Sequence, residues 1–193
     1  MSLRIIAKLF IDGIGPKLAD YVPVFHDFIK NDSLGEVLID VADYSHVFEG
    51  PGIVLIGHSA DYSLDVEKGR AGLRYLRKRA PQLANEEAEA KDALGRMLRA
   101  ALLLEQDARL SGLKFSTLEL EVRFADRLHF PADSVGDAAA RAVLVPALQV
   151  LFPGGFELLR KGTPKELLSF TVKPKTGETL TALSERLDPA RLS

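Results

Sequence analysis

The chain has 193 residues, of which 47% are hydrophobic and 27% are charged, and its formal net charge is −2. These values are typical of an ordinary single globular domain, and the near-neutral balance argues against a dedicated nucleic-acid binder. Because the chain has no cysteine, disulfides, zinc–thiolate sites, iron–sulfur clusters and cysteine nucleophiles are excluded, and a cytoplasmic location is expected. No apolar run approaches the roughly 18 residues that a membrane span needs, and the N-terminus lacks a signal-peptide cleavage pattern.

The first third of the chain predicts a strand, a helix and a hairpin. Residues 4–12 are rich in β-forming side chains and end at a glycine, which predicts a strand. Apolar residues at helical spacing over 16–30 predict an amphipathic helix that begins or bends at Pro23. Two further strands, 37–42 and 53–58, flank the sequence FEGPG, which suits a tight turn.

The remainder predicts a linker, two long helices and three strands. A basic stretch precedes Pro81, after which Asn85 is expected to cap a helix that ends near Gly112. The segment TLELEVRF alternates between apolar and charged residues, as a half-buried strand does. The other expected elements are a helix over 134–151 and two short strands over 156–160 and 167–173.

The two ends of this pattern are similar to each other. Phe10-Ile11-Asp12 matches Phe124-Ala125-Asp126, and Val22-Pro23 matches Val145-Pro146. We therefore expect an α+β domain over 1–193, with a mostly antiparallel sheet backed by helices, built by internal duplication of a βαββ unit. The halves would be about 1–66 and 117–174, joined by 67–116 with its long helix, and followed by a tail over 175–193. The alternative is a chance likeness between two amphipathic helices.

The segment 38–65 concentrates polar side chains around its Gly-Pro-Gly turn. With a loop of two to four residues, His58 lies across from residues 43–45, so Asp43, Tyr44 and Ser45 are its candidate neighbours, and in one register His46 would share its sheet face. The candidates for acid–base catalysis are accordingly His58, Asp43, Tyr44 and His46. The register decides which of them share a face with His58. The other interpretation is a solvated hairpin face, and a metal site is only weakly indicated, because no established ligand motif is present. No metal or cofactor is predicted.

A basic run follows the hairpin. Arg70, Arg74 and Arg77 would share one face if this segment were helical, and Lys78 adds a fourth cation. Such a patch suits phosphate, an acidic partner or an anionic surface. Nucleic acid is not favoured, because Tyr75 is the one aromatic residue among these cations. The alternative is a solvated linker balanced by nearby glutamates.

The C-terminal tail carries leucines at helical spacing. Leu180, Leu183 and Leu187 would line one face of a short helix, with Pro189 at its end. A helix of about ten residues is marginal in water by itself. We therefore expect the tail to dock, either on its own chain or on another subunit.

Three strings, PVFHDFI, LIDVADYSHVFEGPGIVLIGHSADYSLD and GRAGLRYLRKR, resemble a family of small bacterial proteins, including cyanobacterial members, that has no assigned activity. The resemblance covers mainly the first 80 residues. It implies a soluble bacterial protein and transfers no catalytic role.

Since no complete catalytic motif is found, the sequence predicts a non-enzymatic binding or assembly module for an anionic ligand, a protein partner or a second copy of the chain. The alternative is a small acid–base or metal-assisted enzyme that uses the histidines and aspartates of 38–65. The sequence leaves open whether the protein is an enzyme.

Overall fold

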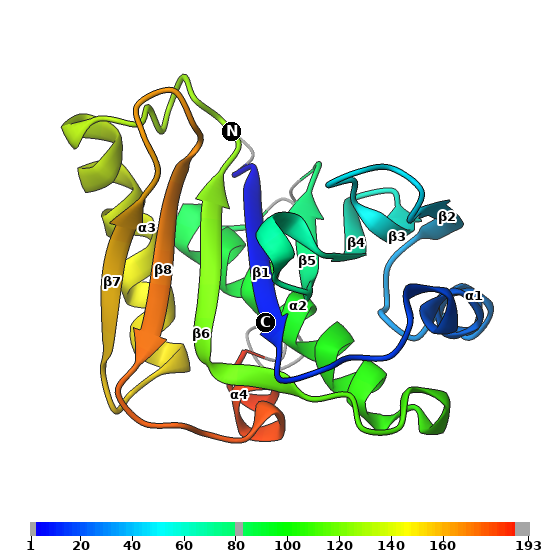
Figure 1. The fold of residues 1–193 in the computed structure, drawn as a ribbon. Coiled ribbons are helices and arrows are strands. Elements are labelled where there is room, and N and C mark those ends of the chain that lie inside the picture. The colour runs from blue at the N-terminus through cyan, green and yellow to red at the C-terminus, as the bar shows by residue number, and fades with distance from the viewer. Residues whose placement is uncertain (1–2, 80–82, 188–193) are drawn as a thin grey trace.

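The structure is a computed structural model that describes residues 3–79 and 83–187. Among these residues, eight strands form one antiparallel sheet in the order β2-β3-β4-β5-β1-β6-β8-β7, backed by helices (Figure 1). The fold is therefore α+β, as the sequence predicts. The strands are β1 (Ile5–Ile11), β2 (Leu38–Tyr44), β3 (Gly52–Gly57), β4 (Ala60–Asp65), β5 (Gly72–Arg77), β6 (Phe115–Phe124), β7 (Phe156–Lys161) and β8 (Leu168–Pro174).

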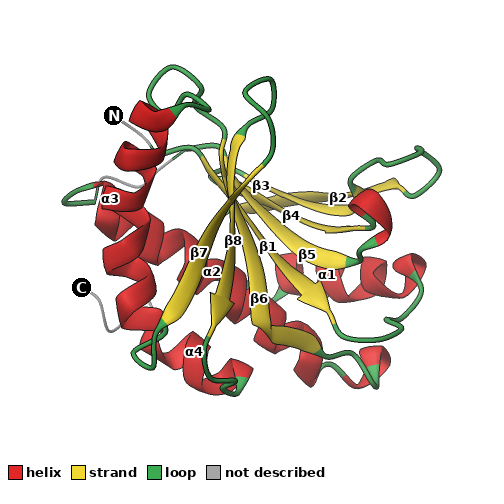
Figure 2. Ribbon diagram, turned by 60° about the vertical axis from the view of Figure 1, so that its left-hand side comes forward, coloured by secondary structure: helices red, strands yellow, loops and turns green. Residues whose placement is uncertain are grey.

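The α-helices are α1 (Tyr21–Lys30), α2 (Glu86–Gln106), α3 (Ser134–Leu151) and α4 (Leu180–Arg186), and short 3-10 turns are η1 (Leu18–Asp20), η2 (Glu67–Gly69) and η3 (Ala108–Leu110). Helix α2 lies across β1 and β5, and α3 and α4 pack against it. Figure 2 shows these three helices along one side of the sheet. Asn85 caps α2 by accepting a hydrogen bond from the Ala88 N–H at 2.9 Å, which confirms the predicted cap.

The sheet has an apolar face and a polar face, which we call the helix face and the open face. On β1, Ile5, Ala7 and Leu9 are buried on the helix face. Lys8 and Phe10 point to the open face and are also buried. They are covered there because the Lys8 amino group donates to the Arg70 carbonyl at 2.8 Å, and the Arg70 guanidinium lies 3.6 Å from the Phe10 ring centre.

Helix α3 is long and apolar enough, by length and composition alone, to cross a membrane. Its Ala140, Leu144 and Leu148 are nevertheless part of the hydrophobic core. A core helix meets the same two criteria, so α3 carries no argument about a membrane.

The stretch expected to be a basic linker is part of the sheet instead. It contains β5 and follows β4, and neither strand was predicted. Because β5 is a strand, alternate residues face opposite ways, so Arg74 and Arg77 lie on opposite faces. The helical face expected for Arg70, Arg74 and Arg77 therefore does not exist.

The structure does not confirm the internal duplication. Among the described residues, the predicted half 1–66 contains four strands and the predicted half 117–174 contains three. The strand that pairs with β1 on the side of the first half is β5, which lies in the predicted linker. The matched prolines also differ in position, because Pro23 lies in the first turn of α1 and Pro146 lies well inside α3. The two matched prolines therefore do not occupy equivalent positions in their helices.

The tail packs on its own chain. Leu180, Leu183 and Leu187 are at most 5% exposed, and α4 lies against α2 and α3. The Arg186 guanidinium donates to the Leu151 carbonyl at 2.9 Å. The expected end at Pro189 lies outside the described residues.

Candidate functional site

The catalytic candidates of the 38–65 hairpin do not converge. The loop between β2 and β3 is longer than expected, and Asp43 pairs with Ile53. Consequently the His58 N–H donates to the Val37 carbonyl at 2.8 Å, so His58 does not lie across from residues 43–45. The predicted register is wrong.

Asp43 and His58 make other contacts in the structure, and Tyr44 and His46 are exposed. Asp43 accepts a hydrogen bond from the Ser45 N–H at 2.8 Å, and its bonds with Ser45 lower the pKa of this exposed carboxyl group. His46 and Tyr44 are exposed in or beside the loop. The His58 Nδ1 lies 3.4 Å from the Arg79 guanidinium. No group of three or more potential metal ligands is found among the described residues.

The four cations of the predicted anion patch are dispersed. Arg70 pairs with Glu119 at 2.7 Å, Arg74 lies 3.3 Å from Asp65, and Lys78 pairs with Asp61 at 2.6 Å. Arg77 is 1% exposed on the helix face and pairs with Asp92. Because each cation already has a carboxylate neighbour, these four residues do not form a common anion site.

A different basic site lies on the open face. A cleft of about 390 Å³ is bounded by η2, by β6 with the residues after it, and by the connection between β7 and β8. We call it the open-face cleft. Its lining residues are Glu67, Lys68, Glu121, Arg123, Arg127, Lys161, Gly162, Lys165, Glu166, Leu167 and Ser169.

The cleft has five basic and three acidic side chains, in a chain whose net charge is −2. Both Glu67 and Glu121 pair with Arg123. The other four cations, Lys68, Arg127, Lys161 and Lys165, form no ion pair with any residue that the structure describes. All four are exposed. The base of the cleft, one arginine between two glutamates, therefore carries a net negative charge, whereas the four other cations and Glu166 make the rest of the lining positive.

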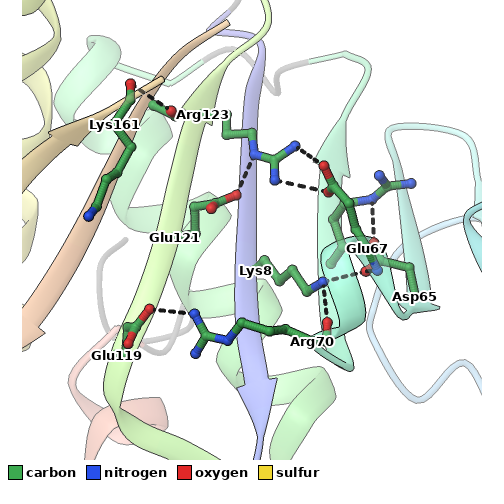
Figure 3. A network of polar contacts seen from close by, with 10 residues as sticks. Lys8, Asp65, Glu67, Arg70, Glu119, Glu121, Arg123 and Lys161 are labelled. Carbon is green, nitrogen blue, oxygen red and sulfur yellow. Dashed lines mark hydrogen bonds and ion pairs between the residues drawn. The ribbon is translucent and has the colours of Figure 1, made fainter. Parts of the chain in front are cut away.

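Arg123 fixes the base of the cleft. Its two terminal nitrogens donate to the two oxygens of Glu67 at 3.0 and 2.9 Å, and its Nε donates to Glu121. Figure 3 shows the guanidinium held between the two carboxylates. Burial by itself would raise the pKa of Glu67, but the hydrogen bonds and charge of Arg123 lower it. This bidentate geometry joins η2 to the central strand β6.

Contacts with β1 and with the end of β4 also hold the turn η2 in place. Lys8 forms an ion pair with Asp65, which is 1% exposed, and Asp65 accepts the Glu67 N–H at 3.2 Å. Figure 3 shows this pair beside the Arg123 network. Lys68 has a left-handed φ of 55°, a conformation that a non-glycine residue adopts only when its surroundings impose it.

The opposite wall is the β7–β8 connection. There the Thr163 N–H donates to Glu166 at 2.7 Å, which lowers the pKa of that carboxyl group. The Ser169 hydroxyl donates to the Lys161 carbonyl at 3.1 Å. These contacts order the turn that carries Lys161 and Lys165.

Apart from Lys68, which belongs to the basic run, sequence reasoning did not single out the cations of the cleft. One signal was present: the alternation of 117–124 places Glu121 and Arg123 together on the polar side of a strand. The pairing of β6 with β8, which brings Arg123 beside Ser169, has no comparable sequence signature.

A second groove, of about 400 Å³, lies between the β2–β3 loop, η1 and η2. Its lining is mainly apolar and includes Phe48, which is 93% exposed, with Val47 and Val66. Glu49 is its one charged residue. Its chemistry therefore differs from that of the open-face cleft.

No protein-family model matches this chain, and a search of curated proteins finds no match either. Function is accordingly argued from the geometry of the site.

Proposed function

We propose that the protein is a binding module for a small anionic ligand, whose phosphate or carboxylate groups bind in the open-face cleft. The observation that carries the proposal is the set of four cations around one cleft that form no ion pair with the described part of the chain, in a protein that is acidic overall. Cations arranged in this way attract anions and hold them through charge-assisted hydrogen bonds.

The size of the cleft favours a small molecule. Its volume of about 390 Å³ lies within the range of small-molecule pockets, roughly 300–1,000 Å³. Since the cations come from three separate segments, we expect a ligand with at least two anionic groups. Binding is favoured over catalysis, because the candidate acid–base residues of the hairpin do not line this cleft.

The test is calorimetric titration of the full chain with pyrophosphate and with citrate as probes. We expect the double substitution Lys161→Ala/Lys165→Ala to weaken binding of at least one probe about tenfold or more, since each charge-assisted contact contributes roughly 1.5–3 kcal/mol when it is well formed. Added salt should weaken the wild-type complex.

Lys30→Ala is the matched control, because Lys30 is an exposed lysine on α1 that does not line the cleft. Its affinity should equal that of the wild type. The proposal is wrong if neither probe binds, or if the control loses as much affinity as the double variant.

A further inference from the structure

A second polar cavity lies on the helix face, between the end of β5 and helix α2. It has a volume of about 50 Å³ and is lined by Glu36, Ser59, Tyr75, Arg77, Arg79 and Arg96. We call it the Glu36 cavity. It is separate from the open-face cleft, because Arg77 and Tyr75 project from the opposite side of the sheet to Arg123.

Glu36 has one carboxylate oxygen without a partner. Its Oε1 accepts a hydrogen bond from the Tyr62 hydroxyl and lies 3.6 Å from the Arg96 guanidinium. Its Oε2 is buried and has no hydrogen-bond partner among the described residues, and the whole side chain is 7% exposed. An ionised carboxylate oxygen only accepts hydrogen bonds, so it calls for a donor.

Hydrogen bonds hold the three arginines of the cavity in place but do not use all of their N–H donors. Arg77 donates to the Tyr75 hydroxyl at 3.2 Å, to the Glu89 carbonyl at 2.9 Å and to Asp92. Arg96 donates from its Nε to Asp92 at 3.0 Å, and Arg79 donates from its Nη1 to the His58 carbonyl at 2.8 Å. Because a guanidinium has five N–H donors, each arginine retains some for a ligand.

A ligand of this cavity must therefore accept hydrogen bonds from arginine and donate one to Glu36. We infer that the Glu36 cavity binds a small tetrahedral oxyanion that still carries a proton, with inorganic phosphate as the fitting example. The size agrees, because about 50 Å³ accommodates roughly four water-sized groups, and a tetrahedral oxyanion has four oxygens.

This chemistry makes a selectivity prediction. Sulfate has the same shape as phosphate but no proton at neutral pH, so one of its bare oxygens would face the Glu36 carboxylate. A site built around a buried hydrogen-bonding group strongly rejects an analogue that lacks the complementary atom. We expect phosphate to bind at least about tenfold more tightly than sulfate.

The experiment compares phosphate with sulfate by calorimetry at pH 7, in the full chain carrying Lys161→Ala/Lys165→Ala, which weakens anion binding at the open-face cleft. Glu36→Gln should bring the two affinities to within about threefold, because its amide N–H₂ can donate to sulfate. Glu87→Gln, which removes an α2 carboxylate that does not line the cavity, should preserve the selectivity.

A second readout places the site independently of these variants. Phosphate should shift the backbone amide resonances of Ser59 and Arg79 in an NMR titration, and the exposed-residue substitution Arg79→Ala should weaken phosphate binding about tenfold. Equal affinities for the two anions, selectivity that survives Glu36→Gln, or absence of shifts at Ser59 and Arg79 would each overturn the inference.

Discussion

Lys8 is a charged residue in the middle of a central strand, and its cost of burial is offset by specific partners. Lys8 is 3% exposed, and its counter-ion is Asp65, which is 1% exposed. Breaking such a pair leaves an uncompensated buried charge, whereas replacing both members by apolar residues is often nearly neutral.

We therefore expect Lys8→Met to lower the free energy of unfolding by roughly 3 kcal/mol. The double variant Lys8→Met/Asp65→Leu should recover part of that loss, since Asp65→Leu also removes the contacts with Arg74 and the Glu67 N–H. Urea denaturation measures both. Lys91→Met, which removes a half-buried i,i+4 pair with Glu87 on the surface of α2, should cost no more than about 0.5 kcal/mol. Additive losses in the double variant would contradict the pairing argument.

Glu36 gives the protein a pH dependence of defined sign. Burial raises the pKa of Glu36 above its ordinary value, although the Tyr62 hydrogen bond and Arg96 oppose this shift. A carboxyl group with a raised pKa in the folded state contributes stability that is fully present below its unfolded pKa and is lost as the pH rises through the folded pKa.

The expected result is that the free energy of unfolding of the wild type, minus that of Glu36→Gln, falls as the pH rises from about 4 towards neutrality. Denaturant titrations at a series of pH values give this difference, and subtracting the variant removes the contribution of the other carboxylates. A difference that rises with pH would mean that Glu36 is stabilised in its ionised form.

At the scale of elements, Gly95 in α2 leaves the space in which the end of α4 packs. A Cβ atom at this position would lie 2.1 Å from the Leu187 carbonyl oxygen. A glycine inside a helix costs about 1 kcal/mol relative to alanine. Glycine at this position therefore lowers the intrinsic stability of α2 but allows the tail to approach this helix closely.

The effect of Gly95→Ala on the free energy of unfolding should consequently have opposite signs in the full chain and in a chain without the tail. In the full chain we expect a loss of roughly 2 kcal/mol or more, because α4 is displaced and its buried leucines are exposed. In a chain truncated after Lys175, the same substitution should stabilise by about 1 kcal/mol. Thermal and urea denaturation measure these effects in four proteins, namely the full chain and the truncated chain, each with and without Gly95→Ala.

The truncation itself should lower the melting temperature without changing the number of chains per particle measured by light scattering, since α4 packs on its own chain. A Gly95→Ala effect that is the same with and without the tail, or fewer chains per particle after truncation, would contradict this view of α4.

Local pattern predicted some elements well and others poorly. Helix α3 was predicted with its bounds, and α2 with its cap, because amphipathic spacing and capping are local properties. Strand β5 was missed because Arg77 occupies a core position, and its counter-ion Asp92 lies on a helix that follows later. The register of β2 and β3 was wrong because hydrogen bonds from Val47 to Tyr44 and from Gly50 to Val47 close a longer loop.

The candidate site was less predictable than the elements. The open-face cleft assembles η2, β6 and the β7–β8 connection, which are adjacent only after the sheet has formed. Each segment by itself contains ordinary exposed charges. The same applies to the Glu36 cavity, whose residues are spread along the chain from Glu36 to Arg96.

At the scale of the whole molecule, β2 is an edge of the sheet. Ile39 is 58% exposed there, and Asp40 and Asp43 are exposed charges on the same strand. The Asp40 side chain also accepts the Val41 N–H at 2.8 Å. Charged residues on an edge strand oppose pairing with another sheet.

We expect Asp40→Val/Asp43→Val to cause concentration-dependent self-association, measured as an increase in mass by light scattering relative to the wild type. The control is Asp12→Val/Glu185→Val, which removes two exposed carboxylates outside the edge strands. If both double variants gain mass equally, general loss of charge explains the effect rather than the edge.

The position of β1 between β5 and β6 has a consequence for synthesis of the protein. Strand β1 is made first, yet its neighbour β6 begins only at Phe115. While the nascent chain extends from β5 to that point, the strand IIAKLFI has an unpaired flank with a single charged residue. Such a flank is a template for wrong pairing. We therefore expect this flank to be open to wrong pairing throughout the interval, which ends when β6 leaves the ribosome.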